Sequence, residues 1–166
     1  MTRTTVLGIF KGILLLVFAA LLTAPMAQAE SFVISQVTVS VFSSCNNGPC
    51  TGVTLTGIDP LSFSLSEGGF TTQNVLHYVT GDSLITHDWN ANFSVTFDVT
   101  TPNATNPLIV SGVLADDRTH ADHLVFSFPN SGNSTWGSGG ALHIELLSPG
   151  SINVGSSTSG NIQAKF

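Results

Sequence analysis

The chain has 166 residues, which is enough for one domain with a single core, and it carries ten acidic and four basic residues. Only Arg118 and Lys165 of the basic residues follow position 29, so the remainder of the chain has a formal charge of −8. Nucleic acid and anionic membranes both attract clustered Lys and Arg. The charge therefore excludes nucleic acid as an expected partner, and it argues against membrane docking.

Residues 1–29 are typical of an export signal. A basic start precedes an apolar run at 12–22, which is shorter than the roughly 20 residues that a membrane-spanning helix needs. Small residues at the positions that a signal peptidase reads predict cleavage after Ala29, so that the mature chain begins at Glu30. We expect a protein that is secreted, exposed on the cell surface or held in the periplasm, with one domain over 30–166.

Cys45 and Cys50 frame the turn-forming sequence Asn-Asn-Gly-Pro. In an oxidising compartment this spacing predicts one disulfide that closes the end of a hairpin. A redox-active pair is the alternative, but such pairs normally have Cys-x-x-Cys spacing and a helix start that lowers the pKa of one thiol. We therefore expect the disulfide to be structural.

Apolar residues after position 30 alternate with polar ones, which is the period of a strand with one buried face. Clear turn signals separate the runs, and one long turn is predicted at 130–140. Eight to ten short strands without a helix predict an all-β fold, a single antiparallel β-sandwich of jelly-roll or immunoglobulin-like topology. Its interior should contain Phe93, Phe97, Phe126, Ile144 and Ile162. The expected strands lie at 37–41, 53–58, 61–65, 75–79, 84–86, 93–99, 108–114, 124–128, 142–146 and 162–166.

The C-terminal half contains short alternating segments separated by glycines: LVFSF from Leu124, WGSGG from Trp136, LHIEL from Leu142, INVG from Ile152 and GNIQA from Gly160. Together with FSVTFDVTTP from Phe93, they resemble the closing strands of small exported bacterial β-sandwich proteins of the PEP-CTERM-associated, anchor-variable type. The resemblance implies a non-enzymatic surface or matrix protein of a Gram-negative bacterium, and it supplies no catalytic residues. No Pro-Glu-Pro sorting tail precedes Phe166, so we expect release rather than anchoring.

One polar segment gathers carboxylates and imidazoles in an expected loop between strands. Oxygen-rich loops hold Ca²⁺, and His with Asp holds Zn²⁺ or Cu²⁺. A solvated loop at the edge of the sandwich is the simpler interpretation, so we expect no cofactor and keep calcium as the alternative. The candidate metal ligands are Asp116, Asp117, His120, Asp122 and His123.

Trp89 and Trp136 lie beside polar or glycine-rich segments. Each is a candidate platform for sugar stacking, and each is equally suited to plugging an end of the core. His143 and Glu145 should project from the solvent face of their strand, opposite its apolar residues. An exposed His beside a carboxylate is more often a surface pair than a catalytic dyad.

Known enzyme signatures are missing from the sequence. It contains neither Gly-x-Ser-x-Gly nor His-Glu-x-x-His, and cleavage would expose Glu30 rather than the histidine of a copper site. We therefore expect no catalytic residues. Three functions remain open: a structural or adhesive surface or matrix protein, a carbohydrate-binding module with or without calcium, and a fibre subunit that exchanges the β-prone segment 31–42. The expected partners are extracellular polysaccharide or other surface proteins.

Overall fold

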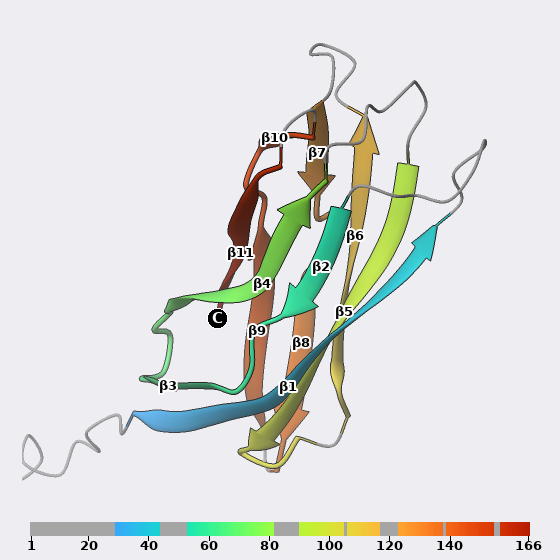
Figure 1. The fold of residues 1–166 in the computed structure, drawn as a ribbon. Coiled ribbons are helices and arrows are strands. Elements are labelled where there is room, and N and C mark those ends of the chain that lie inside the picture. Colours follow the sequence, from blue (N-terminus) through green and yellow to red (C-terminus); the bar gives the residue numbers. More distant parts are fainter. Residues whose placement is uncertain are drawn as a thin grey trace, which may run out of the picture.

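The computed structural model describes residues 29–43, 53–81, 90–104, 106–116, 123–137, 139–154 and 157–166. These residues form eleven β-strands and no helix (Figure 1). The expectation of an all-β chain is thereby confirmed for this part of the sequence. The strands are β1 (Glu30–Ser43), β2 (Val53–Gly57), β3 (Leu61–Leu65), β4 (Thr72–Thr80), β5 (Asn90–Thr101), β6 (Leu108–Asp116), β7 (His123–Ser127), β8 (Gly132–Trp136), β9 (Gly140–Leu147), β10 (Ser151–Asn153) and β11 (Ser159–Lys165).

The strands form two antiparallel sheets. One sheet has six strands in the order β10-β7-β6-β5-β1-β3, and the other has five in the order β2-β4-β11-β9-β8. In Figure 1 the long strand β1 runs diagonally across the molecule. The inward faces of both sheets contribute to one apolar core, in which Tyr78 of β4 meets Phe126 of β7 with ring centroids 5.8 Å apart. Burial of this shared apolar surface is the main force that holds the two sheets together.

The predicted interior positions are confirmed. All five side chains, from Phe93 to Ile162, are at most 2% exposed, and Phe97 is 0% exposed. Along β5, buried residues alternate with half-buried or exposed ones, so Thr96 lies on the outward face beside the buried Phe97. Register follows from this alternation, because a shift by one residue would turn every apolar side chain of the strand to solvent.

Strand β1 changes the phase of its alternation in the middle. Ile34 and Val37 are both buried although three positions separate them, and the pairing with β5 shifts register at this point. The extra residue of such a bulge bends the strand and increases its twist. Residues 30–34 of β1 pair with β3, and β5 pairs with β1 from Val33 to Ser43. The carboxylate of Asp59 supports the bulge, because its Oδ2 accepts a hydrogen bond from the backbone N of Val37 at 3.0 Å.

The prediction of a turn over 130–140 is wrong, because β8 occupies 132–136. Its polar sequence gave no strand signal; the strand is recruited by contacts with another part of the chain. Gly132 lies directly under the side chains of Leu108 and Val110, where a larger residue would collide. Strand β10 has three residues and coincides with the segment at Ile152 that the family resemblance implies as a closing strand, although alternation alone does not predict it. The described residues thus contain eleven strands against the eight to ten expected.

Several predictions fall outside the described residues. These are the export signal over 1–29, of which only Ala29 is described, the Cys45–Cys50 disulfide and the strand at 84–86. They remain predictions.

Candidate ligand-binding groove

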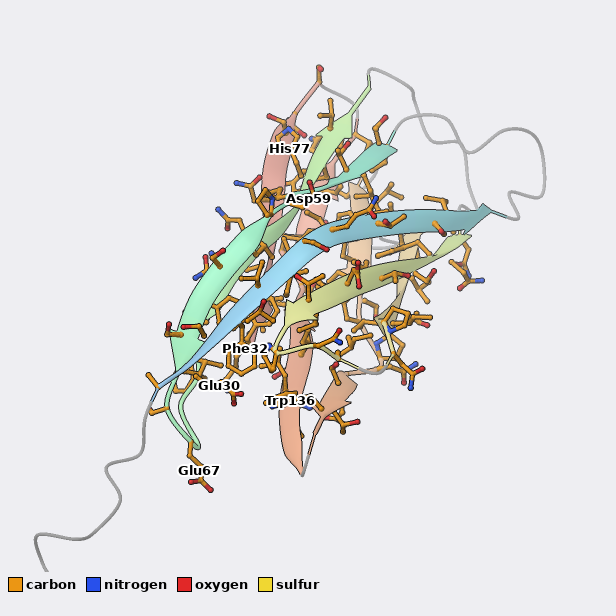
Figure 2. All side chains as sticks on the ribbon, turned by 90° about the horizontal axis from the view of Figure 1, so that it is seen from below. Glu30, Phe32, Asp59, Glu67, His77 and Trp136 are labelled. Atoms are coloured by element: carbon orange, nitrogen blue, oxygen red, sulfur yellow. The ribbon has the colours of Figure 1, made fainter. Side chains whose placement is uncertain are left out.

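A groove of about 580 Å³ opens at one end of the two sheets. Its walls come from the start of β1, the turn between β3 and β4, the β8–β9 hairpin and the C-terminal residue, Phe166. Two backbone hydrogen bonds hold Phe166 in place: its N donates to Thr71 O at 2.9 Å, and its O accepts from Thr71 N at 3.1 Å. Figure 2 shows Glu30, Phe32 and Trp136 close to one another at this end, with Glu67 at the tip of the neighbouring turn.

The floor of the groove is aromatic and rests on the core. Phe32 meets Trp136 edge to face with ring centroids 5.4 Å apart, and it stacks on Phe63 at the same separation. Phe63 in turn packs against Phe166 at 4.6 Å. Contacts between aromatic rings in these geometries add to the gain from burial. The floor is therefore a rigid extension of the core rather than a set of independent side chains.

Trp136 is fixed on three sides. Its indole Nε1 donates to Glu30 Oε1 at 3.1 Å, and its edge rests against Phe32. The third support is Gly140, the cross-strand partner of Trp136, because a Cβ atom at that position would collide with the indole ring. The side chain remains half-buried, so part of the ring is exposed in the groove.

The rim of the groove is polar and acidic. Glu30 and Glu67 contribute carboxylates, and His143 is placed by a 2.9 Å contact between its Nδ1 and Asn133 Oδ1. Among the described residues, no Lys or Arg lines the groove. The side chain of Lys165, next to the lining residue Phe166, lies over the exposed ring of Phe70 instead, with its Nζ 4.7 Å from the ring centre. The groove therefore combines an apolar floor with hydrogen-bond acceptors and a negative charge.

Of the two predicted platforms, Trp136 lines the groove and also packs against the core residue Phe32. Sugar stacking on Trp136 stays a prediction. Trp89 lies outside the described residues. Sequence reasoning did not predict that Glu30 and Glu67 belong to the same site. The one available signal was the position of Glu67 just before Gly68-Gly69, a turn in which Gly68 has a positive φ of 72°.

The structure places only part of the predicted metal loop. Asp116 ends β6, and His123 begins β7 with its Nδ1 3.0 Å from Ser151 Oγ. Asp117, His120 and Asp122 lie outside the described residues. Among the residues that are described, no three His, Cys, Asp or Glu side chains gather into a metal-binding group. A metal site in this loop remains a prediction.

The predicted surface positions on β9 are confirmed. His143 and Glu145 are exposed, while the alternate positions Leu142, Ile144 and Leu146 are buried. On the same outward face of the five-stranded sheet, His77 Nδ1 contacts Asn161 Oδ1 at 3.1 Å. Both imidazoles are thus engaged with amide side chains rather than with carboxylates.

A comparison with protein-family models, with curated proteins and with solved structures found no match. The described part of the chain contains no apolar helix of membrane-spanning length.

Proposed function

We propose that this chain is an exported, non-enzymatic surface or extracellular-matrix protein with a structural or adhesive role, built as a single β-sandwich of jelly-roll or immunoglobulin-like topology. The observation that carries the proposal is the contrast between the two sides of each sheet. The inward sides form one apolar core, and the outward sides carry mainly uncharged polar groups. The sequence resemblance to exported bacterial surface proteins supports the same function.

The outward face of the six-stranded sheet carries rows of hydroxyl groups. The strand register places Ser40, Ser94 and Ser111 side by side across β1, β5 and β6, and Thr38 beside Thr96 in the next row. Uncharged hydroxyl groups stay soluble through hydrogen bonds with water, and they form the same bonds with the hydroxyl groups of polysaccharides. Such a face suits a protein embedded in a hydrated matrix.

The outward face of the five-stranded sheet carries amide pairs instead. Gln163 Nε2 donates to Asn74 Oδ1 at 3.2 Å across the β11–β4 pair, next to the contact of His77 with Asn161. Cross-strand pairs of this kind stabilise a sheet without adding charge. The whole arrangement supports a stable scaffold more than it supports a reactive site.

The alternative of a strand-exchanging fibre subunit receives less support. Its candidate donor strand, β1, lies between β3 and β5 and is paired with both. The strands at the sheet edges, β10, β3, β2 and β8, have three to five residues each. Short edge strands discourage the addition of another chain.

The carbohydrate-binding alternative is favoured by a specific observation, the aromatic groove at Trp136. A half-buried aromatic ring beside carboxylate acceptors is a suitable surface for a sugar. Adhesion to a matrix and binding of one of its sugars are compatible roles.

The proposed function is tested by expressing the full chain in a Gram-negative host and measuring where it accumulates. We expect a secreted or surface-exposed species whose intact mass corresponds to a start at Glu30 with Cys45 bonded to Cys50. The matched control is Leu15→Arg, which interrupts the apolar run of the signal and should retain the protein in the cytoplasm. Cytoplasmic accumulation of the unaltered chain, or a retained signal, would contradict the proposal.

The adhesive part of the function needs its own measurement. Cells of the source organism that lack the protein should form a less cohesive matrix, and purified residues 30–166 added from outside should restore it. Unchanged cohesion in those cells would refute the matrix role.

A further inference from the structure

We propose that the groove at Trp136 binds a short oligosaccharide that carries no acidic group, built from neutral or amino sugars. The inference rests on the proposed export and surface role, and it gives that role a ligand and a site. It follows from the size of the groove, the support of its aromatic ring, its acceptors and its charge.

The groove has the dimensions of a small-molecule site. Its volume of about 580 Å³ lies within the range of roughly 300–1,000 Å³ that is usual for such sites. Its walls are mostly a turn, 65–69, and a hairpin, 136–143. Since turns expose few backbone groups in a regular row, they offer an extended peptide little opportunity to add as a strand. The shape therefore favours a compact ligand.

The aromatic ring of Trp136 is held ready for a ligand before binding. The hydrogen bond to Glu30, the edge contact with Phe32 and the backbone of Gly140 fix the ring. A ligand that packs on a ring already fixed in place does not pay for ordering it. One face of a pyranose ring presents C–H groups, and such a face packs well against the electron-rich surface of an indole.

The acceptors around this ring match the hydroxyl groups of a sugar. Glu30 uses Oε1 for the indole, and its second oxygen, Oε2, is a further acceptor for the hydroxyl group of a ligand. Glu67, in the turn between β3 and β4, is the second acidic residue that lines the groove. Hydrogen bonds from hydroxyl groups to carboxylates are stronger than those between neutral groups. Gly68, Gly69, Gly139 and Gly140 line the groove without side chains, which leaves the backbone there accessible.

The charge of the groove decides which saccharides can enter. Of the residues that the structure describes, two with carboxylates and none with a Lys or Arg cation line it, so uronic acids and sulfated sugars would be repelled. Cleavage after Ala29 would add the α-ammonium group of Glu30 beside its carboxylate, which still leaves one net negative charge. Neutral sugars avoid this repulsion, and the ammonium group of an amino sugar gains attraction from Glu67 and from the indole ring.

The test measures binding of three oligosaccharides to the mature protein by NMR titration, with the indole N–H signal of Trp136 as the reporter. We expect oligomers of N-acetylglucosamine and of glucosamine to shift this signal, and an oligomer of galacturonic acid to leave it unchanged. Galacturonate binding equal to that of the other two would overturn the proposal.

Two variants test the site directly. Trp136→Phe should weaken binding of both hexosamine oligomers by about tenfold, since the smaller ring loses contact area and the hydrogen bond to Glu30. Binding to this variant is measured by calorimetry, because the substitution removes the indole N–H group that reports binding by NMR. The matched control is Phe70→Ala, which removes an aromatic ring that is 69% exposed and does not line the groove. Equal effects of the two variants would contradict the site.

Glu67→Gln tests the charge without altering the core, since Glu67 is exposed. The substitution should weaken binding of the glucosamine oligomer several-fold more than binding of the N-acetylated one. Glu145→Gln, outside the groove, should weaken binding of neither oligomer.

A lysine hexapeptide serves as the competing ligand. If the peptide binds through Glu67 while no saccharide binds, the groove is a cationic-peptide site and the proposal is wrong. Failure of saccharide binding in a protein that is exported and promotes cohesion would refute this inference alone.

Discussion

The indole Nε1 of Trp136 donates a hydrogen bond to Oε1 of Glu30 at 3.1 Å, across 106 positions of the sequence. This contact joins the first strand of the six-stranded sheet to the β8–β9 hairpin of the other sheet, and it forms one wall of the groove. The residue expected at the mature N-terminus is thus part of the candidate site.

Removal of this contact should have a small effect on stability and a clear local effect. Glu30→Ala should lower the free energy of unfolding in urea by about 0.5–1.5 kcal/mol, because one hydrogen bond to an exposed carboxylate is lost. Glu30→Gln keeps an oxygen that can accept from the indole, so it should lower the free energy of unfolding by less. The indole N–H resonance of Trp136 should move in the alanine variant. An unchanged resonance in that variant would mean that the hydrogen bond does not form in solution.

Adjacent positions on β5 should respond very differently to truncation. Phe97→Ala should lower the free energy of unfolding by about 3–5 kcal/mol, because Phe97 is completely buried and its loss opens a cavity. Thr96→Ala, on the outward face of the same strand, should cost less than about 1 kcal/mol. Urea denaturation of both variants measures the difference. Comparable losses would indicate that the register of β5 is wrong.

The buried hydroxyl group of Thr80 forms hydrogen bonds between the end of β4 and the segment that precedes β11. Thr80, 0% exposed, accepts from the backbone N of Thr158 at 2.9 Å and contacts the hydroxyl of Thr158 at 2.8 Å. Thr80→Val keeps the shape but leaves these partners unsatisfied, so it should cost about 1–3 kcal/mol. Thr54→Val is the matched control, since Thr54 is exposed. Equal stability of the two variants in thermal unfolding would argue against the network.

The loop at 117–122 should respond little to calcium, in agreement with a solvated edge loop. Millimolar Ca²⁺ should leave the melting temperature unchanged, and EDTA should have no effect. A ligand that binds only the folded state raises the melting temperature by mass action. A rise with Ca²⁺ that EDTA reverses, and that Asp117→Asn and Asp122→Asn abolish, would establish the calcium alternative instead.

The regular alternation of the sequence was sufficient to predict the main strands and their buried faces. In β5 and β9 the side chains at every second position are apolar and all of these are buried. The physical reason is local: successive side chains of a strand point to opposite faces, so a half-buried strand must alternate. Even the bulge of β1 has a local signal, because the apolar positions Phe32 and Ile34 are out of phase with Val37 and Val39.

Only the tertiary structure decided which glycines lie under aromatic rings and which polar strand completes the second sheet. Gly112 lies under the ring of Phe93, its partner on the neighbouring strand, and Gly140 lies under Trp136. Strand β8 is polar, and its pairing with β9 depends on a glycine that fits beneath Leu108. Close approach of this kind depends on residues distant in sequence, so no local pattern announces it.

The groove likewise depends on the assembled fold. Glu30, Glu67 and Trp136 come from a strand start, a turn and a hairpin that meet only when both sheets have formed. The sequence alone predicted export from residues 1–29, an acidic charge from composition and an all-β fold from alternation. Each of these depends only on residue type or on spacing along a short segment. The meeting of three distant polar and aromatic side chains depends on strand order and register, which are set by packing between the sheets.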